Sequence, residues 1–328
     1  MEKDTGRLNV TGAEALDWFR KMSLIRRFEE RAEEAYGQGR IGGFLHLYIG
    51  EEAIAVGVMA GLAPDDDVIT HYRDHGYFLA RGIDPKRVMA ELYGKSTGLS
   101  KGKGGSMHMV DVAHHLWGGY AIVGGHIPLA TGLALANQYR KRPNVVACIF
   151  GEGATNIGTF YAGLNMAAVW KVPLVAIIEN NRYGMGTAVE RASAVPDAYK
   201  KACAFDIPAV QIDGNDVLTV RDTVRDMAGK ARAGGGPQLI EAMTYRFRGH
   251  SMGDPQRYRT KEEVEKAKAG DPIARWRRTI LSAGLATEHD MNRVADDIEA
   301  ELEAAVRFAE ESPVPDPREL CADVTIME

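Results

Sequence analysis

Residues 144–184 read NVVACIFGEGATNIGTFYAGLNMAAVWKVPLVAIIENNRYG, and this stretch decides the fold class. It contains two apolar runs, residues 144–150 and 172–179, that lack polar alternation, which predicts strands buried on both faces. Residues 159–170, between the two runs, have the apolar spacing of a helix. A strand, a helix and a strand of these lengths predict a right-handed crossover in a parallel sheet.

Working outward from this unit, strand and helix patterns continue to alternate. Further strands are expected at residues 68–72, 209–212 and 238–245, and further helices at residues 51–62 and 217–231. Such alternation predicts the α/β class, with a doubly wound, mainly parallel sheet that carries helices on both faces.

Helical patterns flank the sheet at both ends of the chain. Residues 11–36 begin with Thr11 and Glu14 at capping-box spacing, and residues 287–311 form an amphipathic pattern that stops at Pro313. We expect a single domain over residues 1–328. Its parts are a helical arm (1–40), a sheet core (41–249) and an active-site loop with C-terminal helices (250–328). The polar residues 250–260 contain Gly253 and Pro255, so we expect them to form a mobile loop.

The composition excludes several classes of protein. A net charge of −5 argues against a nucleic-acid-binding protein held by bulk positive charge, and no run approaches the roughly 20 apolar residues of a membrane span. The N-terminus lacks an apolar leader, and Cys148, Cys203 and Cys321 cannot form an even disulfide framework. We therefore expect a cytoplasmic protein.

The turn Gly151-Glu152-Gly153-Ala154 follows the first buried strand. Glycines at such a turn let the backbone approach a phosphate, and a following helix start attracts anions. Asn156 stands where a dinucleotide fingerprint has its third glycine, which disfavours an NAD-dependent dehydrogenase. A plain tight connection between strand and helix remains the alternative.

The next strand ends in Glu179-Asn180-Asn181-Arg182-Tyr183-Gly184. Adjacent parallel strands would bring Glu152 and Asn181 together at the carboxyl edge of the sheet, where open sheets bind ligands. A carboxylate and an amide oxygen suit magnesium, which usually keeps substrate phosphates among its ligands. The pair predicts a magnesium-diphosphate site. The alternative is a turn in which Asn180 and Asn181 have left-handed backbone.

These motifs, taken together, resemble those of a known family. The two turns resemble a thiamine-diphosphate signature, and their surroundings resemble the alpha subunit of the pyruvate dehydrogenase component of 2-oxo acid dehydrogenase complexes. The matching stretches lie between residues 43 and 260: GFLHLYIGEEA, ITHYRDHG, GKGGSMHM, IVGGHIPLATG, NMAAVWKVPLVAIIENNRYGMGT and YRFRGHSMGDPQRYRT.

The resemblance implies thiamine diphosphate and Mg²⁺ as cofactors. It implies that the metal is held by Glu152, Asn181 and the backbone carbonyl of Tyr183. It further implies cofactor contacts from Phe44, Tyr72, Arg73, Ala121, Val123, Gly153, Ala154 and His250, with Tyr72 and Arg73 on the diphosphate and Ala121 and Val123 at the aminopyrimidine.

His46, Arg246 and His250 are implied at the substrate end, as catalytic groups. For His46 a satisfied core histidine is the alternative, and for His250 a solvated loop histidine. His71 and His75 bracket Arg73 without a third ligand that would support zinc.

Two positions depart from the family pattern. Glu152 stands where pyruvate-type relatives usually have aspartate, and glutamate there is similar to the branched-chain 2-oxo acid type. Ala121 stands where glycine is common, so a positive φ at this position would strain the chain. The stretch GLSKGKGGSMHM does not fit the phosphate-loop spacing, and we expect a tight-turn connection.

The resemblance also implies partners. The glutamate that activates the aminopyrimidine lies on a second α/β domain in the family, so a separate beta subunit is expected, in a heterotetramer of two alpha and two beta chains. A lipoyl-bearing acyltransferase and a 2-oxo acid, pyruvate first, complete the expected partners. An acetoin dehydrogenase or branched-chain alpha subunit and a non-catalytic interaction subunit are the alternatives.

Overall fold

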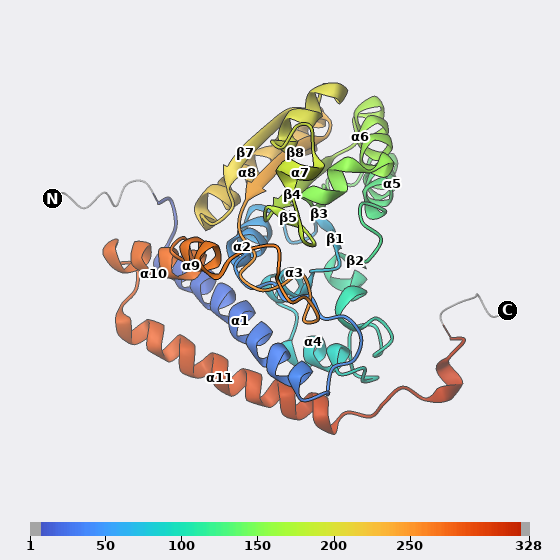
Figure 1. The fold of residues 1–328 in the computed structure, drawn as a ribbon. Coiled ribbons are helices and arrows are strands. Elements are labelled where there is room, and N and C mark those ends of the chain that lie inside the picture. The colour runs from blue at the N-terminus through green and yellow to red at the C-terminus, as the bar shows by residue number, and fades with distance from the viewer. Residues whose placement is uncertain (1–7, 323–328) are drawn as a thin grey trace.

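A six-stranded parallel sheet forms the centre of the chain in this computed structural model, which describes residues 8–322 (Figure 1). The strand order is β2-β1-β3-β4-β8-β7. The strands are β1 (Asp67–His71), β2 (Leu116–Tyr120), β3 (Val146–Gly151), β4 (Leu174–Asn180), β7 (Ala209–Asp213) and β8 (Gln238–Met243). The predicted α/β class with a doubly wound parallel sheet is confirmed.

Helices cover both faces of this sheet (Figure 1). Helices α5 (His126–Tyr139) and α6 (Gly158–Trp170) lie on one face, with the 3-10 segment η4 (Ala198–Phe205). On the other face, α8 (Val217–Lys230) lies against the strands and packs with α2 (Glu52–Gly61). The same apolar core continues beyond them into the remaining helices: α1 (Gly12–Gly37), α3 (His75–Ala80), α4 (Pro85–Leu92), α10 (Pro272–Ser282) and α11 (Glu288–Glu311).

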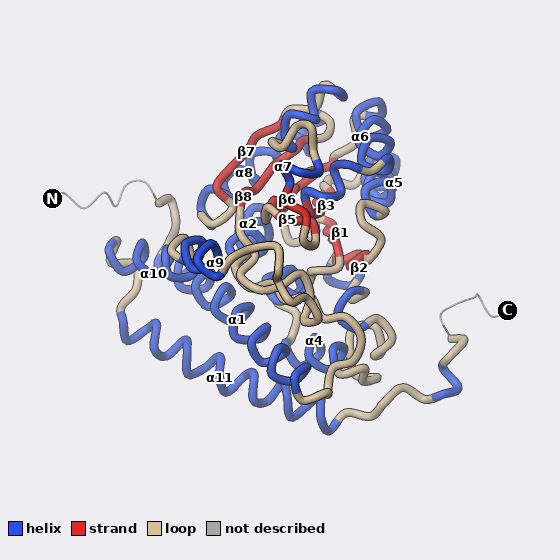
Figure 2. Tube along the Cα trace, viewed as in Figure 1, coloured by secondary structure: helices blue, strands red, loops and turns tan. Residues whose placement is uncertain are grey.

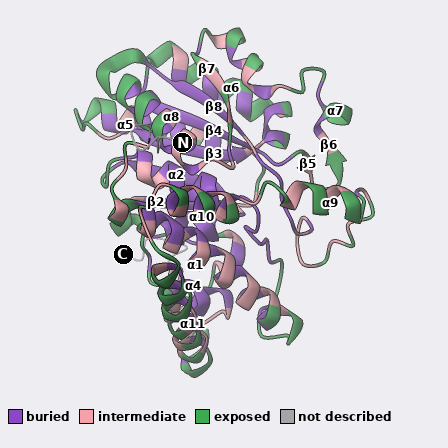
Figure 3. Cartoon of the chain, turned by 90° about the vertical axis from the view of Figure 1, so that its left-hand side faces the viewer, coloured by how far each residue is buried: buried purple, intermediate pink, exposed green. Residues whose placement is uncertain are grey.

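The apolar runs of the central strands serve two separate cores. In β3, Ala147 and Ile149 pack into the core under α2 and α8, whereas Val146, Cys148 and Phe150 pack into the core under α5 and α6. Successive side chains of a strand point to opposite faces, so a strand between two helix layers must be apolar throughout. Figure 3 shows the strands as buried backbone beneath partly exposed helices.

Short elements connect the layers. They are η1 (Gly105–Met107), η2 (Val112–His114), η3 (Glu152–Asn156), the hairpin of β5 (Tyr183–Gly184) and β6 (Thr187–Ala188), α7 (Val189–Ala192), the π-helical η5 (Ala231–Gly235), α9 (Lys261–Lys268) and η6 (Pro317–Glu319). Figure 2 shows, in tan, the long loops that run between the sheet and the region of helices α1 and α4.

The first helix starts as the sequence predicts. The side chain of Thr11 accepts a hydrogen bond from the backbone N–H of Glu14, which completes the capping box of α1. The helix packs against α11, so the two flanking helices meet (Figure 1). Residues 1–7 of the proposed arm lie outside the described residues, and the division of the chain into arm, core and C-terminal part stays a prediction.

Glu91 organises the glycine-rich loop that follows α4. Its buried carboxylate accepts four backbone hydrogen bonds from this loop. The donors are the amides of Ser100 (2.8 Å) and Gly102 (2.9 Å) on Oε2, and of Gly104 (2.8 Å) and Gly105 (3.0 Å) on Oε1. The loop is thus built as an anion nest whose anion is the chain's own carboxylate.

None of the helices within residues 8–322 combines the length and the apolar character that a membrane crossing requires.

Candidate active site

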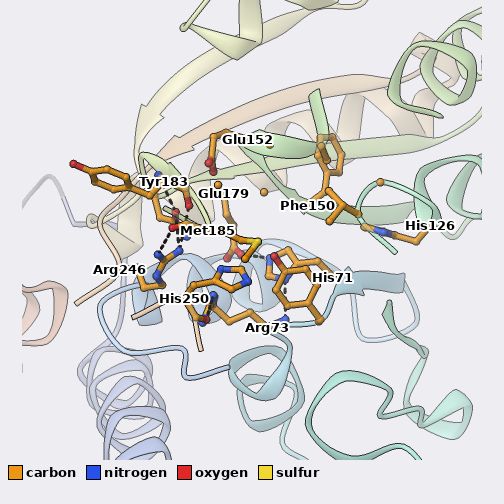
Figure 4. A pocket seen from close by; sticks show the side chains of 18 residues that line it. His71, Arg73, His126, Phe150, Glu152, Glu179, Tyr183, Met185, Arg246 and His250 are labelled. Atoms are coloured by element: carbon orange, nitrogen blue, oxygen red, sulfur yellow. Dashed lines mark hydrogen bonds and ion pairs between the residues drawn. The ribbon is translucent and has the colours of Figure 1, made fainter. Parts of the chain in front are cut away.

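A pocket opens at the carboxyl ends of β1, β3 and β4 (Figure 4). The chain proceeds from β1 outward to β2 and then returns past β1 to β3, so the pocket lies where the strand order reverses. Most of the predicted site residues line it: Tyr72, Arg73, Val123, Glu152, Gly153, Ala154, Asn181, Tyr183, Arg246 and His250.

The two turns that the sequence singled out lie next to each other. Strands β3 and β4 pair in parallel with Gly151 opposite Glu179, and Glu152 and Asn181 follow these residues at the same edge. The expectation that neighbouring strand ends bring Glu152 and Asn181 into one site is confirmed.

Glu152 begins the 3-10 turn η3, and the α-helix starts only at Gly158. The helix predicted at residues 159–170 is confirmed, and one short turn separates it from the end of β3. The side chain of Glu152 is buried at the pocket wall, and burial raises the pKa of its carboxyl group to about 7, with Arg246 opposing this shift. A carboxylate in this setting needs a cation beside it to remain charged.

Asn181 presents its oxygen to the pocket. Oδ1 lies 3.4 Å from the backbone nitrogen of Tyr183 and 3.5 Å from Nη1 of Arg246. The same guanidinium group donates to the carbonyl oxygens of Tyr183 (3.2 Å) and Met185 (3.1 Å), toward which Arg246 points in Figure 4. Two of the oxygens predicted to hold the metal, Asn181 Oδ1 and the Tyr183 carbonyl oxygen, thus already face a guanidinium group.

The backbone of this turn differs from the alternative expectation. The left-handed residues are Arg182, with φ 76°, and Met185, with φ 54°, while Asn180 and Asn181 have negative φ. The interpretation of the two asparagines as left-handed turn residues is therefore wrong. Their side-chain amides donate to carboxylates, Asn180 to Glu241 and Asn181 to Glu51, both at 2.8 Å.

Arg73 holds two segments at the pocket floor. Its guanidinium donates to the carbonyl oxygens of Leu47 and His250, both at 2.8 Å. Arg73 is 3% exposed, so these bonds are made away from solvent. Tyr72, the preceding residue, directs its ring toward two histidines.

His46 and His250, two of the residues predicted at the substrate end, lie close to each other and to Tyr72. The ring of His46 lies 4.6 Å from the Tyr72 ring and 5.1 Å from the His250 ring, measured between centroids. Burial, reinforced by Arg73, lowers the pKa of His46 to about 2 and that of His250 to about 3, so both rings are neutral at pH 7. Each has a buried Nδ1 without a hydrogen-bond partner among residues 8–322. Phe44, 67% exposed, lies 6.5 Å from His46 at the outer edge.

These contacts bear on the alternatives for the two histidines. His250 is more than half buried within the loop that follows Arg246, so the interpretation as a solvated loop histidine is wrong. His46 is buried, but its Nδ1 is unpaired, so it is not a satisfied core histidine either.

The segment predicted to contact the aminopyrimidine is only partly at the pocket. Val123 lines the pocket and is 46% exposed, whereas Ala121 does not line it. Ala121 is not among the described residues with positive φ, so the strain considered for alanine at this position does not occur.

Sequence reasoning missed a buried hydrogen-bonded group around Glu179, which lines the pocket together with His71. The Oε1 atom of Glu179 accepts hydrogen bonds from the hydroxyls of Tyr77 (2.5 Å) and Tyr48, and Oε2 accepts from Nε2 of His71 (2.5 Å). The backbone nitrogen of Arg73 donates to Nδ1 of His71, which fixes the proton of this ring on Nε2. All of these residues except Tyr77 lie in motifs quoted above, but nothing in the sequence pairs them.

The residues present fit a metal-bound diphosphate. Burial leaves the Glu152 carboxylate in need of a cation, and Asn181 and Tyr183 contribute oxygens that already face a positive group. A Cβ built on Gly151 would meet nothing within 4 Å, and one on Gly153 would meet only the Cα of Gly184 at 3.9 Å. The glycine turn therefore leaves open space beside these oxygens for phosphate groups.

Comparisons with known proteins agree with this geometry. Residues 20–318 match the family described as "Dehydrogenase E1 component". The "Pyruvate dehydrogenase E1 component subunit alpha" of Rhizobium meliloti (strain 1021) is 48% identical, covering 94% of this chain and 89% of the relative. Proteins of the same description from Zymomonas mobilis subsp. mobilis and Rickettsia felis are 46% and 45% identical, covering 98% and 96% of this chain and 91% and 96% of the relatives.

Proposed function

This chain belongs to the Dehydrogenase E1 component family, and on that premise we propose that it acts as the alpha subunit of a pyruvate dehydrogenase. The reaction is oxidative decarboxylation. The carboxyl group of pyruvate leaves as CO₂, the electrons of the broken bond reduce a lipoyl disulfide on the acyltransferase, and the two sulfurs take the acetyl group and a proton. The observation that carries the proposal is the convergence of Glu152, Asn181 and the Tyr183 carbonyl at one pocket wall.

The family implies thiamine diphosphate, and the donor set at the pocket supports Mg²⁺ as its companion. We assign Glu152, Asn181 and the carbonyl oxygen of Tyr183 to the metal, and Gly153 and Ala154 to the diphosphate. When bound, the cofactor supplies the carbon nucleophile and the electron sink for decarboxylation. Arg246 touches two of the metal-site oxygens, so we place its guanidinium at the diphosphate end of the site as well as near the substrate.

The histidine pair is suited to proton handling near the substrate carbonyl. His46 and His250 are neutral, and each has a buried, unpaired Nδ1. A neutral imidazole can donate from one nitrogen or accept at the other, so the pair can stabilise charge on an oxygen or hold a proton at Nδ1. The rings of Phe44 and Tyr72 lie beside His46, at 6.5 Å and 4.6 Å between centroids.

The active enzyme further requires a beta subunit. We propose a heterotetramer of two alpha and two beta chains in the cytoplasm, with cofactor at each alpha–beta boundary and a lipoyl-bearing acyltransferase as the acceptor. Val123 lines the pocket and is 46% exposed, and Phe44, beside His46, is 67% exposed; these apolar surfaces support a site that another chain completes. The acetoin and branched-chain alternatives are not favoured, because the three relatives described above are named as pyruvate dehydrogenase subunits.

The test is reconstitution with a co-expressed beta chain, followed by dye-reduction assays on pyruvate, acetoin and a branched 2-oxo acid. We expect pyruvate to be preferred, activity to require both chains, and both thiamine diphosphate and MgCl₂ to be needed. Asn181→Ala should weaken cofactor binding in calorimetry, whereas Asn292→Ala, an exposed change on α11, should not. Robust turnover by the alpha chain alone, or preference for acetoin, would contradict the proposal.

A further inference from the structure

Two adjacent glutamates lie at the start of helix α2, and one of them, Glu51, contacts a residue of the pocket wall. Glu51 and Glu52 are both fully buried. The carboxylate of Glu52 accepts from the guanidinium of Arg26 and from the backbone nitrogen of Gly50, away from the pocket. Glu51 Oε1 instead accepts a hydrogen bond of 2.8 Å from Nδ2 of Asn181.

This contact decides which end of the Asn181 amide faces the pocket. A carboxylate has only acceptor atoms, so it can pair with the NH₂ group of an amide and not with its oxygen. With Nδ2 held by Glu51, Oδ1 turns toward Arg246 Nη1 and the backbone nitrogen of Tyr183. The opposite orientation would place two oxygens against each other and present an N–H group to the cation.

Glu51 is itself held by a positive group. Its Oε2 lies 3.6 Å from Nε of Arg73 and is buried without a hydrogen-bond partner among the described residues. Arg73 in turn is fixed by the carbonyl oxygens of Leu47 and His250. The carboxylate therefore stands between a cation on one side and an amide NH₂ on the other, which leaves it one favourable orientation.

We propose that Glu51 is a positioning residue that fixes the amide of Asn181 with Oδ1 toward the bound Mg²⁺. The inference rests on the proposed function, because Asn181 is assigned there as a metal ligand. Groups that orient a metal ligand from behind typically change metal affinity 10- to 100-fold when they are replaced.

The geometry predicts how Glu51→Gln acts. Arg73 attracts the amide oxygen of Gln at this position, so the amide NH₂ turns toward Asn181. Asn181 must then rotate to offer Oδ1 to that NH₂ group, and its own NH₂ group faces the metal site. We expect the Mg²⁺ concentration that half-saturates thiamine diphosphate binding to rise by about tenfold or more.

A second substitution, at Asn181, restores an arrangement in which an oxygen atom of residue 181 faces the metal. In the double variant Glu51→Gln/Asn181→Asp, one carboxylate oxygen accepts from the glutamine NH₂ and the other faces the metal. Asn181→Asp alone sets two carboxylates within hydrogen-bonding distance and should weaken Mg²⁺ binding. We expect the double variant to bind Mg²⁺ more tightly than either single variant.

The experiment uses the reconstituted alpha–beta enzyme, with calorimetric titration of thiamine diphosphate over a series of MgCl₂ concentrations and thermal unfolding of each variant. Glu52→Gln is the matched control, being adjacent and equally buried: it should lower thermal stability and leave the Mg²⁺ requirement unchanged. Three results would each overturn the positioning role alone. They are a wild-type Mg²⁺ dependence in Glu51→Gln, an equal loss of Mg²⁺ affinity in Glu52→Gln, and a double variant that binds Mg²⁺ no more tightly than the single variants. A wild-type enzyme that binds no thiamine diphosphate with Mg²⁺ would overturn the proposed function and this inference together.

Discussion

Arg73 donates a hydrogen bond of 2.8 Å to the backbone carbonyl oxygen of His250, a residue 177 positions later in the chain. The same guanidinium binds the carbonyl oxygen of Leu47, close to His46. One buried side chain therefore sets the spacing between the two segments that carry the histidines of the site.

Arg73→Lys should loosen this arrangement. A lysine ammonium is a single point of attachment and cannot bridge both carbonyl oxygens as the planar guanidinium does. We expect the free energy of unfolding to fall by about 1.5–3 kcal/mol, the range for a hydrogen bond to a charged group. Proteolysis within residues 249–260 should also become faster. Thermal unfolding and limited proteolysis measure these effects, with Arg318→Lys, whose side chain is 90% exposed, as the control. Cleavage at the wild-type rate would refute the bridging role.

Glu91→Gln tests the internal nest of the glycine-rich loop. The amide keeps one oxygen, but its NH₂ group then faces two backbone donors that have lost their acceptor. We expect a loss of about 2–4 kcal/mol in unfolding free energy, measured by urea denaturation. Glu265→Gln, on a side chain that is 68% exposed, should change it by less than about 0.5 kcal/mol. Equal stability of the two variants would show that the loop does not depend on this carboxylate.

Asp74→Asn should make stability less dependent on pH. Burial raises the pKa of Asp74 from 3.8 to about 7, and both carboxyl oxygens lack hydrogen-bond partners among residues 8–322. Because the folded pKa is the higher one, this group's contribution to stability is full below about pH 4 and is lost as the pH rises to about 7, by roughly 4 kcal/mol in all. The variant has no proton to lose, so its stability relative to wild type should increase by about 2–3 kcal/mol between pH 5 and pH 7.5.

The measurement is urea unfolding of both proteins at several pH values. Asp296→Asn removes the same charge from an exposed position of α11 and should give a constant difference from wild type. If the difference for Asp74→Asn also stays constant with pH, the carboxyl group is not protonated in the folded protein and the prediction fails.

Tyr77→Phe removes one of the three donors on Glu179. Burial, together with Glu179, raises the pKa of Tyr77 well above 10, so its hydroxyl is a proton donor at every pH at which the protein is folded. We expect a loss of about 1–3 kcal/mol in unfolding free energy, because a hydrogen bond to a buried charge is removed. Thermal unfolding provides the measurement, and Tyr139→Phe, 87% exposed, is the control. A loss no larger than that of the control would contradict the network.

The central strands could be predicted because burial on both faces leaves a clear pattern. Residues 144–150 and 172–179 contain almost only apolar side chains, and β3 and β4 begin and end within two residues of these runs. Strand β2 was not predicted, since its sequence LWGGY holds two glycines and is too short for a period to be recognised. It forms because it pairs with β1, with an irregularity in register between Val68 and Thr70.

The site could be predicted where its residues are neighbours in sequence or end adjacent strands. Glu152 and Asn181 belong to this class, and they do line one pocket. Glu51 does not, because sequence alone gives two equivalent acids at positions 51 and 52, and the direction of each is set by the first turn of α2. Glu179 was missed as an anchor because its three partners lie more than 100 positions away in the chain.

The glycine-rich loop after α4 forms an anion-binding site that a side chain of the same protein, Glu91, already occupies. Because the Glu91 carboxylate is covalently part of the chain, it cannot diffuse away from these four amides. Inorganic phosphate in solution would have to displace it in order to bind there. The four backbone donors of this glycine cluster are therefore already satisfied, whereas the turn at Gly151 and Gly153 has open space beside it.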